Sequence, residues 1–267
     1  MRHLVAFAIA ALGLAACASG PSAPGPGRYA AVVAAPDRDA ADRVNDVRRK
    51  PAEMLAFIGV RPGMTVEDLS AARGYTSELL ARAVAPDGKV YAQNAPRVAG
   101  RTPPPQPEGA AAPAPTTAPA PLPTLAERVR NPALAAVLVP VTRPFEDPVP
   151  PDAEGRLDLV TLMFNYHDFG HLGVDRAQVN RAVFRGLKPG GLYVIADHAG
   201  RAGTGISESG TLHRVEEALV VREVEAAGFR LDARGDFMRN PNDPRDRNTP
   251  EPPMPKDEFV LRFVKPR

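Results

Sequence analysis

Short apolar runs alternate with amphipathic segments along most of the chain. The runs Leu157–Met163 and Leu192–Ala196 are largely apolar, a pattern typical of strands buried on both faces of a parallel sheet. Thr76–Val84 and Arg176–Leu187 instead repeat apolar residues every three to four positions, as an amphipathic helix does. The pattern therefore predicts strands that alternate with helices.

The same criteria place the other elements, with Gly and Pro marking the turns. We expect strands at 65–69, 89–93, 139–141, 157–163, 192–196, 229–233 and 259–264. We expect helices within 37–55 and at 52–58, 75–84, 125–138, 176–187 and 213–227. Two consecutive strands end the chain. This order predicts an α/β, Rossmann-like, doubly wound sheet of seven strands, mostly parallel with one antiparallel strand near its edge.

The N-terminus has the composition of an export signal. Arg2 and His3 precede the apolar run Leu4–Ala16, which is too short to span a bilayer but suits a signal peptide. The run ends at Cys17 in a sequence that resembles the bacterial lipoprotein box, so Cys17 is the expected lipidation site; an ordinary cleaved signal is the alternative. We expect residues 1–16 to be a lipoprotein signal peptide and 17–36 a flexible tether. The protein would then be anchored in the cell envelope, facing the periplasm.

Composition narrows the picture further. Cys17 is the only cysteine, so the mature chain would have no thiol for disulfides, metals or catalysis. Many of the 31 prolines fall in 101–123, which predicts a disordered Pro/Ala insertion within a folded domain at 37–267. The net charge is only +2 and no basic stripe is interleaved with aromatics, which argues against a nucleic-acid partner.

A tight turn of small residues joins the first predicted strand to its helix. Asp68, Ser70, Ala72 and Gly74 alternate along it, and Tyr75 opens the helix. A strand, such a turn and a helix N-terminus form a nucleotide-binding unit, because the helix offers free N–H groups. Glycine is favoured in such turns where φ is positive. At Ser70 and Ala72 a positive φ would cost about 0.5–1 kcal/mol or more each.

These residues resemble class I S-adenosylmethionine-dependent methyltransferases. In that family the turn reads Asp/Glu-x-Gly-x-Gly-x-Gly, where this chain has Asp68-x-Ser70-x-Ala72-x-Gly74. More closely, the chain is similar to a family of predicted bacterial methyltransferases, some of them exported. The motifs Leu187–Gly191 and Ala226–Phe229 are shared with class I methyltransferases as a whole. Those shared with the closer family are Asp46/Arg49/Pro51, Gly74–Leu79, Tyr166-His167-Asp168, Asp197-His198 and His213-Arg214.

The resemblance implies a cofactor site at the carboxyl ends of the strands. S-adenosylmethionine would be the cofactor and a small molecule the methyl acceptor. The residues expected to wrap the methionine part are Asp68, Ser70, Ala72, Gly74 and Tyr75. Gln93 and Asn94 stand where the family has an acidic residue for the ribose. An amide can still bind a hydroxyl, without the charge-assisted strength of a carboxylate.

The histidines of the mature chain cluster around the fourth and fifth strands. His167-Asp168-Phe169 looks like the His-Asp-Trp of small-molecule O-methyltransferases, which implies that His167 is the general base. Asp168 or Asp197 would orient it, and His198 would face the same cleft because the two strand ends adjoin. Alternatively, these histidines only cap strand ends and bond to backbone.

Two further interpretations stay open. His167, His171, Asp197, His198 and His213 offer enough donors for zinc or another divalent ion, although His-x-x-x-His spacing needs a helix across 167–171 and Gly170 disfavours one. We predict no metal. The degraded turn also fits a catalytically inactive binding or scaffolding module of the cell envelope, since no supply of a cytosolic cofactor is evident there.

Overall fold

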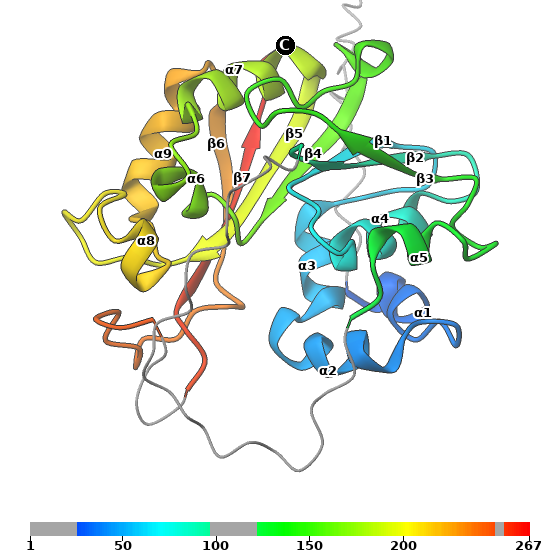
Figure 1. Ribbon diagram of the computed structural model, residues 1–267, viewed down its shortest axis with the longest axis horizontal. Helices are drawn as coiled ribbons and strands as arrows, with labels where there is room; N and C mark the ends of the chain where they lie inside the picture. Colours follow the sequence, from blue (N-terminus) through cyan, green and yellow to red (C-terminus); the bar gives the residue numbers. More distant parts are fainter. Residues whose placement is uncertain (1–25, 97–121, 249–253) are drawn as a thin grey trace, which may run out of the picture.

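Seven strands form one twisted, mixed sheet with helices on both faces (Figure 1). The computed structural model describes residues 26–96, 122–248 and 254–267. The strand order is β3-β2-β1-β4-β5-β7-β6, and β7 runs antiparallel to both of its neighbours. The predicted α/β, mostly parallel sheet with an antiparallel strand near its edge is therefore confirmed. The strands are β1 Thr65–Leu69, β2 Lys89–Asn94, β3 Leu138–Thr142, β4 Leu157–Met163, β5 Leu187–His198, β6 Arg230–Gly235 and β7 Glu258–Val264.

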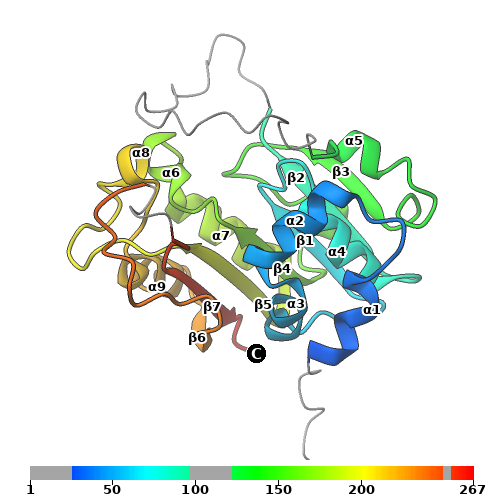
Figure 2. The same ribbon diagram turned by 90° about the horizontal axis from the view of Figure 1, so that it is seen from below.

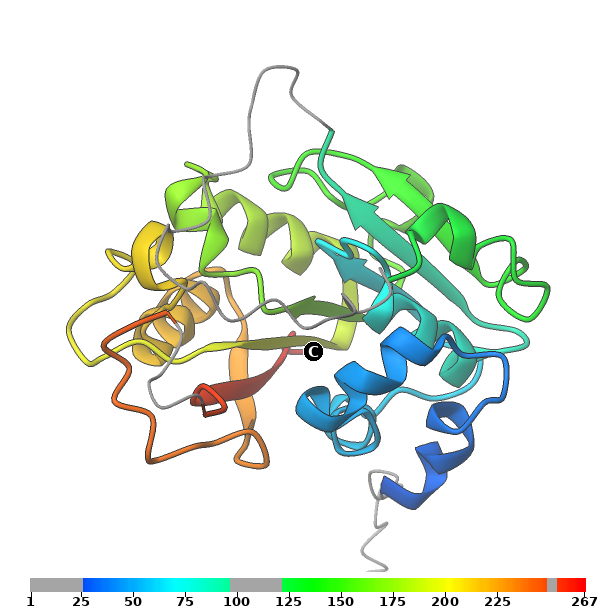
Figure 3. The same ribbon diagram turned by 60° about the horizontal axis from the view of Figure 1, so that its bottom comes forward.

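Two hydrophobic cores lie on opposite faces of the sheet. In β5, Val194 packs into one core and Ile195 into the other, so a strand with successive apolar residues is buried on both sides. Figures 2 and 3 show α3 and α4 against one face and α7 and α9 against the other. The helices are α1 Ala30–Val33, α2 Ala40–Arg49, α3 Pro51–Ile58, α4 Tyr75–Val84, α5 Leu125–Arg128, α6 Asp168–His171, α7 Arg176–Gly186, α8 Ser209–Leu212 and α9 Glu217–Ala226.

The folded part of the chain begins before residue 37. A 3-10 turn, Pro26–Tyr29, leads into α1, and the Tyr29 ring is buried in the core with α3. Its hydroxyl donates to the carbonyl of Val60 at 2.6 Å. Residues 26–36, which the sequence assigns to a flexible tether, thus belong to the domain: the Tyr29 ring, its hydrogen bond to Val60 and the part-buried Val32 and Val33 together attach them to the core.

Two predicted helices are shorter than expected. The segment predicted as a helix at 125–138 is helical only over α5, and turns follow it, because Pro132 has no N–H to continue a helix. The helix predicted at 213–227 begins at Glu217. Val215, ahead of it, makes a β-bridge with Ala199 and is held in the sheet.

Several predictions fall on parts of the chain outside the described residues. These are the signal peptide, lipidation at Cys17, residues 17–25 of the tether, and residues 101–121 of the Pro/Ala insertion. Leu122 and Pro123, the last residues of the predicted insertion, are described and half-buried. Within the described ranges, no helix combines the length and apolarity needed to cross a bilayer.

The carboxyl ends of β1, β4 and β5 meet at one edge of the sheet. Met163 pairs with Ala196, and the N–H of Phe164 donates to the Ala196 carbonyl at 2.7 Å. The segment after β4 therefore lies beside Asp197 and His198. On the other side of β4, Asp68 of β1 pairs with Thr161. The predicted cofactor and catalytic residues thus come from adjacent strands.

Candidate active site

A cleft of about 240 Å³ opens beside the turn between β1 and α4. Four of the predicted cofactor residues, Asp68, Ser70, Ala72 and Tyr75, line it, and Gly74 is the N-cap of α4 directly behind them. The other lining residues are Asn45, Arg49, Ala71, Arg73, Thr76, Leu122, Met163, Phe164 and Asn165. The cleft therefore joins the turn to the end of β4 and to α2.

The turn has the backbone of a glycine-rich loop without its glycines. The φ angles of Ser70, Ala72 and Gly74 are 59°, 51° and 84°. The left-handed region costs a residue with a Cβ about 1–2 kcal/mol. Ser70 and Ala72 thus hold the conformation that the sequence pattern predicts, at the cost expected for residues that carry a side chain.

Gln93 and Asn94 brace this turn. The fully buried Gln93 accepts the Ser70 N–H at 2.9 Å through Oε1 and donates to the Arg143 carbonyl at 2.6 Å through Nε2. Asn94 accepts the Ala72 N–H at 2.8 Å through Oδ1. These bonds stabilise the two strained residues. Neither amide lines this cleft, and their contact with a ribose stays a prediction.

Asp68 is a buried carboxylate at the floor of the cleft. It accepts hydrogen bonds from Ser77 Oγ at 2.5 Å and Thr161 Oγ1 at 2.8 Å. Burial raises the pKa of Asp68 to about 6, against the opposing effect of those two hydrogen bonds. At neutral pH the group is ionised, and it is a negative charge that a cationic ligand group would stabilise.

Arg49 is the positive counterpart of Asp68 in the same cleft. Its guanidinium lies 3.9 Å from the centre of the Phe164 ring, a cation–π contact. No carboxylate within the described ranges forms an ion pair with it. Burial and the neighbouring Arg48 lower the pKa of Arg49 to about 10, so it stays charged at neutral pH. The sequence marks Arg49 only as part of a motif; its place in the cleft depends on its contact with Phe164, far along the chain, which no local pattern reveals.

The four predicted catalytic residues lie together beyond Phe164. His167 Nδ1 lies 2.6 Å from Asp197 Oδ1, and its Nε2 lies 3.1 Å from Asp168 Oδ1. The fully buried Asp197 also accepts the backbone N–H groups of His167, at 2.8 Å, and His198, at 2.7 Å. Of the two orienting residues that the sequence leaves open, Asp197 contacts Nδ1 of His167 and Asp168 contacts Nε2 on the other side of the ring.

Two carboxylates control the protonation of His167. Burial lowers its pKa, but the charge of Asp197 and the hydrogen bonds to Asp168 and Asp197 outweigh this and raise the pKa to about 10. Both ring nitrogens then donate at neutral pH. His167 by itself has no nitrogen free to accept a proton, so it is not poised as a general base in this arrangement.

Two further histidines complete the cluster. His213 Nδ1 lies 3.4 Å and His171 Nδ1 3.8 Å from the same Asp168 oxygen. His171 ends the short helix α6, so Gly170 does not prevent the helical turn across 168–171 that the sequence disfavours. His213 follows α8 in the left-handed region, with φ 51°. Its approach depends on the packing of α8 against α6, which is not visible in the sequence.

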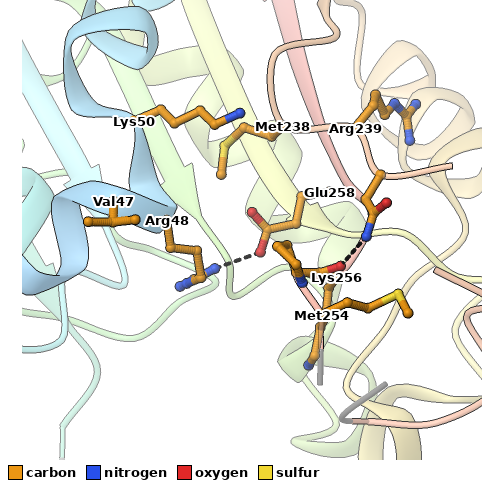
Figure 4. A pocket seen from close by; sticks show the side chains of 10 residues that line it. Val47, Arg48, Lys50, Met238, Arg239, Met254, Lys256 and Glu258 are labelled. Carbon is orange, nitrogen blue, oxygen red and sulfur yellow. Dashed lines mark hydrogen bonds and ion pairs between the residues drawn. The ribbon is translucent and has the colours of Figure 1, made fainter. Parts of the chain in front are cut away.

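His198 lies between this cluster and a larger cavity of about 690 Å³: its ring centre is 5.5 Å from that of His167, and it contacts Glu258, which lines the cavity. His198 Nδ1 lies 3.0 Å from Glu258 Oε1, and burial lowers the pKa of His198 well below its usual range. Glu258 reaches the cavity wall and pairs with Arg48 at 2.6 Å (Figure 4). The cavity is lined by Val47, Arg48, Lys50, Met238, Arg239, Asn240, Met254, Pro255, Lys256 and Glu258.

Comparison with solved structures places this arrangement in a known fold. A methyltransferase of Aquifex aeolicus that depends on S-adenosylmethionine superposes with a TM-score of 0.53 at 18% identity, covering 85% of this chain and 100% of its own. A Galdieria sulphuraria protein named as a sarcosine dimethylglycine methyltransferase gives 0.53 at 15% identity, covering 90% and 98%. The chain has the class I methyltransferase fold. No family model and no curated protein matches the sequence.

The cleft fits part of the cofactor that this fold implies. S-adenosylmethionine carries an α-amino group and a carboxylate at one end, and Asp68 and Arg49 offer one charge of each sign in the same cleft. The volume of 240 Å³ is below the roughly 300–1,000 Å³ of pockets that enclose a whole small molecule. The charges and the size therefore match the amino-acid end of the cofactor.

Proposed function

We propose that this protein transfers a methyl group from S-adenosylmethionine to a small acceptor. The observation that carries the proposal is the pair of opposite charges, Asp68 and Arg49, in a cleft at the carboxyl edge of a methyltransferase-fold sheet. Asp68 would accept from the cofactor's ammonium group and Arg49 would donate to its carboxylate. Charge-assisted hydrogen bonds of this kind contribute about 1.5–3 kcal/mol each.

The acceptor would occupy the cavity on the other side of α2. Arg48 faces that cavity and Arg49 the cofactor cleft, and both contact the Phe164 ring, at 5.1 and 3.9 Å. Lys50 donates only to the Phe237 carbonyl and Lys256 only to the Asn248 amide among the described residues. Burial lowers the pKa of Lys256 to about 8. These basic side chains beside Met238 and Met254 support a small anionic acceptor with an apolar part.

We assign activation of the acceptor to the cluster of His167, Asp168 and His213. The general-base role that the sequence predicts for His167 alone is not supported, because Asp197 and Asp168 hold both of its ring nitrogens. Asp168 and His213 are part-exposed, so a bound acceptor can reach them.

Calorimetric titration with S-adenosylmethionine and with its demethylated product tests the cofactor assignment. Wild-type protein should bind both, and Arg49→Gln should weaken binding by about tenfold or more, which corresponds to loss of one charge-assisted hydrogen bond. Arg48→Gln is the matched control, because its side chain pairs with Glu258 in the other cavity. Absence of binding by the wild type would favour an inactive binding module instead.

We also propose that the protein is exported and lipid-anchored through Cys17. The N-terminal apolar run and the sequence around Cys17 support this. Metabolic labelling with a radioactive fatty acid in a bacterial host should label the wild type and not Cys17→Ser. Both proteins should be recovered in comparable amount, the wild type in the envelope fraction and the variant there or as unprocessed precursor. Equal labelling, or none in either protein, would contradict lipidation at this residue.

A further inference from the structure

We propose that His167, Asp168 and His213 form a binding site for a divalent transition-metal ion. Donor atoms of these three residues all lie within 4.8 Å of one another. They come from the segment after β4 and from the residue that follows α8, so chain segments far apart in sequence supply the site. The inference does not rest on the proposed methyl transfer, since a metal can bind whether or not the cofactor does.

The distances are compatible with metal coordination as well as with hydrogen bonding. His167 Nε2 and His213 Nδ1 lie 3.1 and 3.4 Å from Asp168 Oδ1. Charge-assisted hydrogen bonds are shorter, at about 2.7–2.9 Å. Neighbouring ligands around a tetrahedral zinc ion, each bound at about 2.0–2.1 Å, are separated by roughly 3.3 Å. An ion drawn between these atoms would therefore need only small movements of the side chains.

A second carboxylate orients the proposed His167 ligand. Asp197 Oδ1 lies 2.6 Å from His167 Nδ1, which leaves Nε2 as the nitrogen directed at Asp168, and a bound ion would displace the Nε2 proton to solvent. Metal-bound histidines almost always donate their other ring N–H to a carboxylate or carbonyl in this way. Asp197 is fully buried and holds the His167 backbone as well, so the ring has little freedom to turn.

Close packing of α6 and α8 holds the His213 side in place (Figure 1). Ser209 Oγ of α8 donates to the His167 carbonyl and accepts the His171 N–H at 2.9 Å. A Cβ on Gly170 would lie 2.4 Å from Ile206 Cγ1, so only glycine permits this approach. The contact brings His213, held with φ 51°, to Asp168.

The donor set defines the class of ion. Two imidazole nitrogens and one carboxylate oxygen suit zinc and its neighbours, whereas magnesium and calcium prefer oxygen ligands. Three protein ligands leave coordination positions open, as in catalytic metal sites. An acceptor oxygen bound there would lose its proton more readily, because the ion acts as a Lewis acid.

Calorimetric titration of metal-free protein, prepared without a His-tag, with zinc chloride tests the proposal. The wild type should bind one ion per chain, and His213→Gln should weaken binding by about tenfold or more, as loss of one ligand does. His198→Gln is the matched control, since this histidine contacts Glu258 and lies outside the proposed donor set. Visible d–d absorption of the cobalt(II) complex provides a second measure, independent of activity.

Three outcomes would overturn the proposal. One is no zinc binding by a wild-type protein whose circular dichroism shows it folded. Another is equal zinc affinity in the wild type and in His213→Gln. The third is a cobalt(II) spectrum unchanged by His213→Gln. His213 is part-exposed, so its substitution should leave the fold intact, and Asp168→Asn provides an independent second variant.

Discussion

Glu67 of β1 should make the protein less stable as the pH rises towards neutrality. Its side chain is fully buried, and neither carboxyl oxygen has a hydrogen-bond partner within the described residues. Burial raises the pKa of Glu67 from 4.5 to about 8. Between these values the folded protein holds a proton that the unfolded chain releases, so the free energy of unfolding falls as the pH increases.

The size of this effect follows from the pKa difference. Between the two pKa values, each pH unit lowers the free energy of unfolding by about 1.36 kcal/mol. From pH 4.5 to pH 7 the loss of stability therefore reaches about 3 kcal/mol. Glu67→Gln keeps the shape of the protonated side chain and cannot ionise. We expect the variant to be more stable than the wild type. The difference in their free energies of unfolding should be about 2.5 kcal/mol larger at pH 7 than at about pH 5.

Urea unfolding followed by far-UV circular dichroism measures this difference, because the chain contains no tryptophan. Asp68 titrates in both proteins and cancels from the comparison. Glu53→Gln on α3 is a matched control, since that carboxylate is exposed and should change stability by at most about 0.5 kcal/mol at either pH. A gain in the Glu67→Gln variant that does not depend on pH would refute the reasoning.

Other substitutions test the backbone strain in the turn between β1 and α4 and the buried ion pairs of Arg128. Ser70→Gly and Ala72→Gly should each raise the free energy of unfolding by about 0.5 kcal/mol, because relief of the positive φ exceeds the entropy cost of glycine. Ala71→Gly, between them, should lower it by about 0.5–1 kcal/mol; the same sign for all three would contradict this account. Arg128→Met should cost about 3–5 kcal/mol in urea unfolding, because it leaves buried Asp42 and Glu78 without their shared cation. An unchanged midpoint would show that the three charges do not act as a unit.

Local sequence patterns predict much of the fold. β4 spans the residues predicted, because seven largely apolar residues between turns leave few alternatives to a buried strand. The helix predicted at 125–138 ends at Arg128. The composition of the segment favours a helix, but Pro132 has no N–H to donate to the Arg128 carbonyl. The strand predicted at 192–196 begins later than β5, which starts at Leu187. Leu187 pairs with Leu157 across a register shift, which depends on tertiary contacts.

The sequence predicts less of the candidate site than of the fold. The alternation of Asp68, Ser70 and Ala72 locates the turn, because the backbone geometry of such turns restricts which residues they accept. Gln93 and Asn94 end β2, at the position where the sequence places them. Their amides bond to the turn between β1 and α4, a contact that depends on the folded chain. His213 reaches Asp168 through helix packing, so no spacing in the sequence reveals the contact.

The burial of Tyr29 sets a limit on where the protein can act. If Cys17 carries a lipid, nine residues connect it to the 3-10 turn that begins at Pro26, and fully extended they would span at most about 30 Å. A domain restricted in this way samples only a thin layer of the periplasm. Its acceptors would then be molecules that lie at the membrane or diffuse close to it, and an encounter with them would resemble a search in two dimensions.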